Sequence, residues 1–263
     1  MQKIIRLLSI LMLSAAFNTT FAAPQVIVTY TPPVDENLKP YYEFLKSRQA
    51  LEAAAGTAKL LQWPTPLTLE AKQCNEVNAM YVPGEARVIM CYEIFKDLVE
   101  KVEAQLGHHD QKYRDDIKKH AAVFLFRHEL SHAIFDILKI PLIGNEEIAA
   151  DAVAFHYSLE QKDMAEVKKL LQGAKFYFMR RNENFGDDTR YDFGAFSDIH
   201  PLSEQRYFNM LCYTYAKFPE EAEFLVKQEL LPQGRADYCP REWKQLQDGV
   251  HRLIRPYAVK AKK

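Results

Sequence analysis

Two histidines and a glutamate near the middle of the chain form the pattern with the clearest chemical meaning. They lie in the segment His128-Glu129-Leu130-Ser131-His132. Histidines four residues apart on a helix project from the same face, so both imidazoles can reach one metal ion at about 2.0–2.1 Å. Glu129 projects one step further round the helix, where it can hold a metal-bound water instead of the metal. This spacing predicts one zinc ion per chain, with His128 and His132 as ligands.

The surrounding sequence favours a helix for this motif. Apolar residues recur at three- and four-residue steps from Ile117 to Phe135, on the same stripe as the two histidines. Such a stripe is typical of a helix that is buried on one face. The alternative is a pair of core histidines that bind backbone or carboxylate groups and no metal. The five-residue motif alone leaves both interpretations open, because it also occurs by chance in ordinary helices.

A second group of acidic residues follows after a short break. Glu147 and Asp151 lie four residues apart in the segment 145–151, which opens a new helix. A catalytic zinc needs a third protein ligand and leaves one position for water, and Glu147 can be that ligand. Asp151 can then accept a hydrogen bond from the second ring nitrogen of His128 and orient its imidazole. The alternative, acids that complement a helix N-terminus, suits Glu146 but not Asp151, which lies deeper among apolar residues.

The two segments together resemble the gluzincin metallopeptidases, a group that includes thermolysin and the CAAX-prenyl-protease-like peptidases. The shared pattern is H-E-x-x-H followed by E-x-x-A-D, at residues 128–132 and 147–151. The resemblance implies that Glu147 is the third zinc ligand. It also implies that Asp151 does not bind zinc itself but interacts with a residue that does. The elongated metzincin motif does not fit, because it needs glycine and histidine where this chain has Phe135 and Leu138.

A longer match covers nearly the whole chain after residue 23. Its parts, in order, are Cys74 with residues 78–81, residues 89–93, 141–147 and 200–206, and finally Cys212. This order resembles a bacterial family of putative metallopeptidases of unknown function. The resemblance implies a zincin-like metallopeptidase fold and no particular substrate.

His200 is the other histidine with a predicted role. Pro201 follows it directly, and Arg206 follows six residues later. The segment resembles one downstream of the zinc ligands in the CAAX-protease-like group, where a histidine could donate to the tetrahedral oxyanion. The alternative is a histidine at a helix entry, before a proline in the first helical turn. Arg206 could pair with Asp151 or with another acid near the metal.

These residues predict a zinc-dependent metallopeptidase in which Glu129 is the general base. Zinc activates a water and polarises the scissile carbonyl, while Glu129 takes the proton and later delivers it to the leaving amine. Apolar runs at 77–82 and 86–91 predict a hairpin whose edge aligns a peptide or protein substrate by strand addition. Two other classes stay open: a zinc-binding regulatory protein with little hydrolytic activity, and a metal-free helical interaction protein.

The first 23 residues predict a secretory signal peptide. Lys3 and Arg6 supply positive charge, residues 4–17 are mostly apolar, and Thr20-Phe21-Ala22 offers small residues at the positions that a signal peptidase reads. We therefore expect a periplasmic or secreted protein with no membrane segment after cleavage. The chain has 34 basic and 35 acidic residues, and a net charge of -1 argues against a nucleic-acid-binding surface.

Export permits disulfides, and all four cysteines lie after residue 23. No two of them form a C-x-x-C pair, so a cysteine zinc site is not expected. Four cysteines allow three connectivities. We favour Cys74 with Cys91 and Cys212 with Cys239, because each pair flanks one local unit. Cys74 and Cys91 are expected on opposite arms of the predicted hairpin.

The remaining pattern predicts one mainly helical α+β domain over residues 24–263, with a small sheet beside the metal-binding helix. Residues 24–40 contain four prolines and predict an extended lead-in, and the β part lies within 67–91. A polar loop is expected at 182–200. Helices are expected at 41–61, 92–106, 115–138, 146–159, 164–179, 201–217, 219–230 and 240–254.

Overall fold

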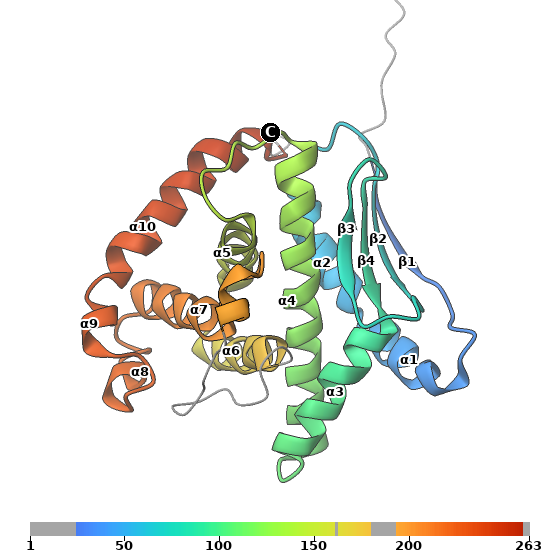
Figure 1. Ribbon diagram of the computed structural model, residues 1–263, viewed down its shortest axis with the longest axis horizontal. Coiled ribbons are helices and arrows are strands. Elements are labelled where there is room, and N and C mark those ends of the chain that lie inside the picture. The colour runs from blue at the N-terminus through green and yellow to red at the C-terminus, as the bar shows by residue number, and fades with distance from the viewer. Residues whose placement is uncertain (1–24, 161–162, 180–192, 260–263) are drawn as a thin grey trace, which may run out of the picture.

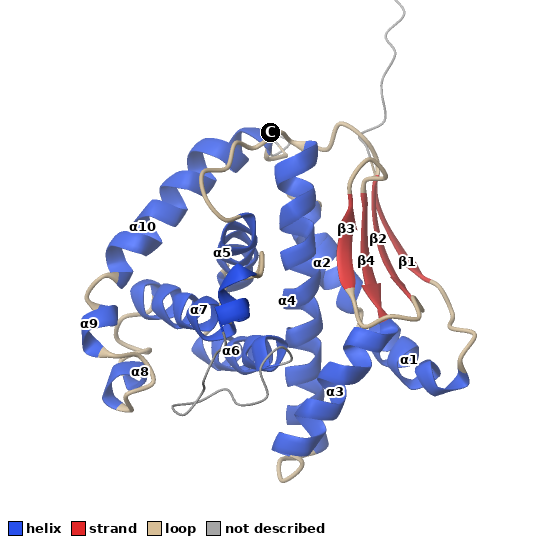
Figure 2. Ribbon diagram, viewed as in Figure 1, coloured by secondary structure: helices blue, strands red, loops and turns tan. Residues whose placement is uncertain are grey.

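The structure is a computed structural model that describes residues 25–160, 163–179 and 193–259 (Figure 1). The predicted signal peptide at 1–23 lies outside these residues, as does most of the predicted loop at 182–200. The described chain is mainly helical α+β with one four-stranded mixed sheet (Figure 2). None of its described helices is both long and apolar enough to cross a membrane.

Four strands and ten helices can be traced in the described residues. The strands are β1 (Val26–Tyr30), β2 (Leu67–Lys72), β3 (Ala79–Val82) and β4 (Arg87–Cys91). The helices are α1 (Lys39–Ser47), α2 (Ala50–Ala58), α3 (Tyr92–Leu106), α4 (Gln111–Ile137), α5 (Glu146–Leu159), α6 (Met164–Met179), α7 (Ser203–Lys217), α8 (Phe224–Lys227), α9 (Gln233–Ala236) and α10 (Cys239–Gly249). A π-helical turn, Val250–Ile254, continues α10.

The sheet has the order β1-β2-β4-β3, and its first three strands run parallel. The predicted hairpin is confirmed: β3 and β4 pair antiparallel, with Tyr81 opposite Val88. Gly84 allows the tight turn between them because its φ of 82° is open mainly to glycine. β3 lies at the edge of the sheet, with one side free of any strand partner among the described residues.

The expectation for the N-terminal third is wrong in two places. The lead-in at 24–40 contains β1, which pairs in parallel with β2. Its sequence, VIVTY, consists of β-branched and aromatic residues typical of a strand, and these residues alternate between half-buried and exposed. The helix expected at 41–61 is two helices, because Gln49 takes a left-handed conformation with φ of 52°.

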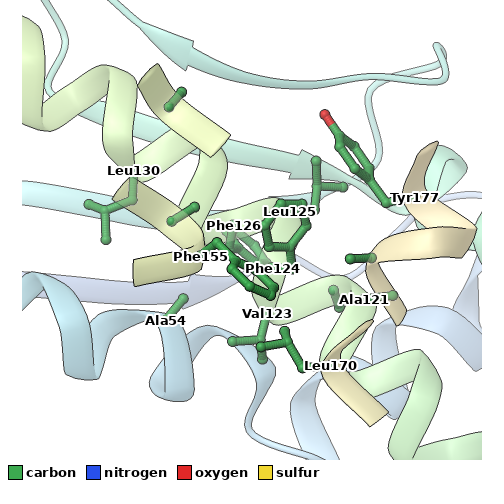
Figure 3. Close-up of a cluster of buried hydrophobic side chains, with 14 of the residues drawn as sticks. Ala54, Ala121, Val123, Phe124, Leu125, Phe126, Leu130, Phe155, Leu170 and Tyr177 are labelled. Atoms are coloured by element: carbon green, nitrogen blue, oxygen red, sulfur yellow. The ribbon is translucent and has the colours of Figure 1, made fainter. Parts of the chain in front are cut away.

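Helix α4 lies between the sheet and the later helices and contacts both. β3, β4 and α2 pack on one side, while α5 and α6 pack on the other (Figure 1). Phe124, Leu125 and Phe126 on α4 contribute to the buried cluster around it (Figure 3). α4 begins four residues before its predicted start, because the Asp110 side chain caps it by accepting the N–H of Tyr113.

The later helices follow the prediction with one exception. α5 and α6 have the predicted bounds. The helix expected at 219–230 is wrong, since only the four residues of α8 are α-helical there. Pro219 precedes this stretch, and Glu229, with φ of 58°, turns the chain at its end.

Both predicted disulfides are present, Cys74–Cys91 and Cys212–Cys239. The position of Cys74 differs from the expectation, because it does not lie on an arm of the β3–β4 hairpin. It follows β2, whose last residue, Lys72, is paired with Cys91 on β4. The bridge therefore joins the ends of two parallel strands.

Candidate metal centre

Three side chains from two helices converge at one point. His128 and His132 lie one turn apart on α4, and Glu147 lies in the first turn of α5. The Nε2 atoms of the two histidines are 3.3 Å apart. One carboxylate oxygen of Glu147 lies 3.1 Å from Nε2 of His128, and the other lies 3.5 Å from Nε2 of His132.

These distances fit a metal ion. Zinc binds histidine nitrogen and carboxylate oxygen at about 2.0–2.2 Å, so two ligand atoms at a tetrahedral angle are about 3.3–3.5 Å apart. Two histidines and one glutamate are also a donor set that leaves one position of zinc open to water. A second group of suitable residue types, Cys74, Cys91 and Glu93, holds its cysteines in a disulfide and has no thiolate to offer.

The carboxylate of Glu147 is kept ionised. Burial alone would raise its pKa, but hydrogen bonding with His128 and the nearby histidine charges outweigh burial and lower the pKa. A carboxylate must be deprotonated to bind a metal, so this environment suits a ligand.

The Nδ1 atom of each histidine lies close to a carboxylate other than that of Glu147. Nδ1 of His128 lies 2.9 Å from Asp151, although the ring N–H is not well aligned with that oxygen. Nδ1 of His132 lies 2.8 Å from Oε1 of Glu146. Such carboxylates fix the orientation of ligating imidazoles in metal sites. The sequence predicted this place for Asp151 but treated Glu146 only as a helix-start acid.

Arg206 closes the buried side of the site. It is 1% exposed and binds Asp151 through two hydrogen bonds, Nε to Oδ2 at 2.5 Å and a terminal nitrogen to Oδ1 at 2.9 Å. The same guanidinium lies 3.8 Å from Glu147. Burial would raise the pKa of Asp151, but the charge of Arg206 and hydrogen bonding with His128 lower it. Asp151 is therefore an anion shared between Arg206 and His128.

The turn between α4 and α5 places Glu147 next to His128 and His132. Lys139 and Gly144 both have positive φ, at 54° and 107°, and reverse the chain after α4 ends. Asn145 then caps α5 by accepting the N–H of Ile148 at 3.0 Å. Glu147 follows within the first helical turn, where the positive end of the helix favours a carboxylate.

Glu129 faces a cavity of about 250 Å³ beside the ligands. The cavity is lined by Asn78, Ala79, Ile94, Leu125, Glu129, Tyr177 and His200. Burial raises the pKa of the Glu129 carboxyl above its ordinary value. The Tyr81 backbone N–H donates to Oε2 of Glu129 at 3.0 Å. Glu129 therefore lines the cavity and lies outside the group of three residues that could hold a metal.

His200 and Tyr177 line the same cavity with different polar contacts. Nε2 of His200 lies 3.2 Å from Glu147 and Nδ1 lies 3.1 Å from Asp198, so both ring nitrogens are engaged. The hydroxyl of Tyr177 makes no hydrogen bond within the part of the chain that the structure describes, and it points away from the packed side chains (Figure 3). The sequence singled out His200 but gave no signal for Tyr177, which sits in an ordinary apolar helix pattern.

Comparison with known proteins gives one match. Residues 30–254 match the family DUF4344, described as "Putative metallopeptidase". Neither the curated proteins nor the solved structures contain a match. Because the matched residues make up most of its length, the chain belongs to the DUF4344 family of putative metallopeptidases.

Proposed function

We propose that this protein is a zinc-dependent metallopeptidase of the gluzincin type, with His128, His132 and Glu147 as metal ligands. One observation carries the proposal: the Nε2 atoms of His128 and His132 lie 3.3 Å apart, and each lies 3.1–3.5 Å from a carboxylate oxygen of Glu147, near a cavity lined by Glu129. A pair of core histidines that binds no metal has no need of a third ligand at this distance. Family membership supports the same class of reaction.

The chain's own residues account for the proton transfers of peptide hydrolysis. A bound zinc would supply a Lewis acid that lowers the pKa of water and polarises the scissile carbonyl. Glu129 accepts the proton of the attacking water on a carboxylate oxygen and then delivers it to the leaving amine. Its raised pKa, caused by burial, brings it closer to the range in which one carboxyl can do both.

Two other polar residues that line the cavity, Tyr177 and His200, have different roles in this proposal. The Tyr177 hydroxyl donates a hydrogen bond to the oxygen that gains charge in the transition state, because Tyr177 lines the cavity and its hydroxyl has no hydrogen-bond partner among the described residues. His200, which the sequence suggested for this role, holds Glu147 in place through Nε2. His200 therefore supports a ligand and borders the substrate.

The substrate in this proposal is a peptide or protein, and the compartment is the periplasm or the exterior. The outer side of β3 has no strand partner among the described residues. Its Tyr81 N–H is bound to Glu129, and the other backbone groups of this edge support strand addition by an extended peptide. Two disulfides support an oxidising compartment.

The test is to compare wild type with Glu129→Gln for zinc content and for cleavage of a mixed peptide library. Wild type should bind about one zinc per chain and cleave peptides, since its donor set is complete. Glu129→Gln should keep the zinc and lose cleavage, because an amide cannot accept the proton. His128→Ala is the matched control and should lose both. Zinc retained in His128→Ala would refute the metal site, and zinc lost in Glu129→Gln would make Glu129 a ligand.

A further inference from the structure

Tyr81 makes two hydrogen bonds to α4, and they connect the edge strand to the metal-binding helix. Its backbone N–H donates to Oε2 of Glu129 at 3.0 Å, and its hydroxyl donates to Oδ2 of Asp136 at 2.7 Å. Glu129 and Asp136 are seven residues apart, so they lie on one face of α4, about 10 Å apart along its axis. A single strand residue therefore spans two turns of the helix.

Strand pairing leaves the Tyr81 N–H available for this contact. Along an antiparallel strand, residues alternate between those whose N–H and C=O face the partner strand and those that face away. The C=O of Asn78 accepts the N–H of Cys91 on the β4 side at 3.1 Å. Even-numbered residues of β3 therefore pair with β4, and the N–H groups of Ala79 and Tyr81 point away from it.

The carboxylate of Glu129 depends on this strand for its orientation. Glu129 is only 9% exposed, so water has little access to it. Within the described residues, the Tyr81 N–H is the donor that forms a hydrogen bond with it. Tyr81 is held in turn by Asp136, whose other oxygen accepts a bond from the exposed Lys139 at 3.0 Å. The Glu129 carboxylate on α4 is therefore oriented by a residue of β3.

We infer that Tyr81 is a positioning residue: its hydroxyl, anchored on Asp136, fixes the edge strand so that its backbone N–H holds the Glu129 carboxylate. The catalytic consequence rests on the proposed function, whereas the contact itself is a property of the fold. Without the hydroxyl, β3 can shift along α4 and the carboxylate loses its fixed direction. The chemical step should then suffer more than substrate binding does.

Hydrogen exchange of the position-81 amide tests the contact without any substrate. In the purified full-length mature protein, with and without zinc, Tyr81→Phe and Asp136→Ala should speed this exchange by about tenfold or more. Asp136→Asn keeps an acceptor oxygen for the hydroxyl and should restore protection. Lys139→Met removes the other partner of Asp136 and should leave exchange unchanged. The amide of Met80, which pairs with β4, reports general loosening of the strand.

Unchanged exchange in Tyr81→Phe would overturn the inference, as would equal acceleration at positions 80 and 81. For the catalytic consequence, Tyr81→Phe should lower kcat several-fold with KM and zinc content unchanged, and Asp136→Asn should retain most of the activity. A raised KM with normal kcat would assign β3 to substrate binding and overturn the positioning role. If wild type cleaves no peptide, the proposed function fails and the exchange results alone decide whether the contact exists.

Discussion

The carboxylates of the candidate metal centre differ in burial, and burial determines how strongly each one can support its histidine. Asp151 is 4% exposed and is shared by His128 and Arg206. Glu146 supports His132 in the same manner, but its side chain is 53% exposed. A contact in low dielectric is stronger than the same contact in water, so the two supports should not be equal.

The predicted order of zinc affinity is wild type, then Glu146→Gln, then Asp151→Asn, then Glu147→Ala. Loss of a carboxylate behind a ligating histidine typically lowers metal affinity about 10–100-fold, and the exposed Glu146 should lie at the low end of that range. Glu147→Ala removes a direct ligand and should lower affinity most. Zinc titration against a competing chelator measures all four proteins.

Asp151→Asn needs a stability control because it also leaves Arg206 without its anion. Removing one partner of a buried ion pair costs about 3–5 kcal/mol of folding free energy. Urea unfolding of the metal-free proteins separates this loss from the loss of zinc affinity. If Asp151→Asn bound zinc more weakly than Glu147→Ala after this correction, Asp151 would be the third ligand.

A second prediction concerns the hydroxyl of Tyr177 and its effect on kcat. Tyr177→Phe should lower kcat by about 10²–10³-fold, the usual effect of removing one donor to a developing oxyanion. Zinc content and stability should hardly change, because the ring keeps its contacts with Phe124 and Phe178. Tyr157→Phe, in a different cavity, is the control and should keep full activity. Full activity of Tyr177→Phe would leave the oxyanion role to His200.

The sequence could predict the groups at short spacing but not the contacts that depend on tertiary packing. His128, His132, Glu147 and Asp151 repeat at helical intervals, so their shared faces follow from helix geometry. Tyr177 and Tyr81 reach the site from α6 and β3, and nothing in their own segments marks them. Their role appears only when those elements pack against α4.

Among the secondary-structure elements, α4 and α6 approach so closely that one position must be glycine. A Cβ on Gly173 of α6 would lie 2.7 Å from the backbone nitrogen of Ala121 on α4 and 3.1 Å from the carbonyl oxygen of Ile117. Both neighbours are backbone atoms of a long helix and cannot move alone. The closeness lets Tyr177, one turn further along α6, reach the metal-site cavity.

Gly173→Ala should therefore lower the free energy of unfolding by about 1–3 kcal/mol, the range for overpacking a tight interface. The better helix propensity of alanine opposes this by only about 1 kcal/mol. Gly56→Ala in α2 is a matched control, because a Cβ there meets nothing within 4 Å. It should be neutral or stabilising. Urea unfolding of both variants checks the prediction, and a stabilised Gly173→Ala would contradict the packing argument.

Element boundaries were predictable where local signals and packing agree. α5 begins after the capping Asn145, and α6 follows its apolar periodicity, so both have the predicted bounds. β1 was missed because the prolines on both sides of it favoured an extended lead-in, although its residues suit a strand and pair with β2, 41 residues away in sequence. The break at Gln49 has no glycine or proline to announce it.

In the whole molecule, the helices beyond α4 contain a largely buried titratable group outside the candidate metal centre, His156, whose side chain is 13% exposed. His156 on α5 packs against Trp243 of α10 with ring centroids 5.4 Å apart. Glu160 and Lys217 are its charged neighbours, and Nδ1 has no hydrogen-bond partner among the described residues. Burial lowers the pKa of His156 below its ordinary value, against the opposing effect of Glu160.

This depressed pKa predicts a loss of stability in mild acid. An unfolded chain binds a proton at His156 near pH 6.5, whereas the folded chain binds it only at lower pH. The contribution of uncharged His156 to folding stability is thus fully present above about pH 6.5. It is lost as the pH falls from there toward the pKa of His156 in the folded protein. His156→Gln cannot be protonated and should lose less stability between pH 8 and pH 5 than wild type does. Urea midpoints of the metal-free proteins at both pH values measure the difference, and the metal-site histidines cancel because both proteins contain them. An equal pH dependence in the two proteins would show that His156 titrates normally and that the contact of α5 with α10 is open to water.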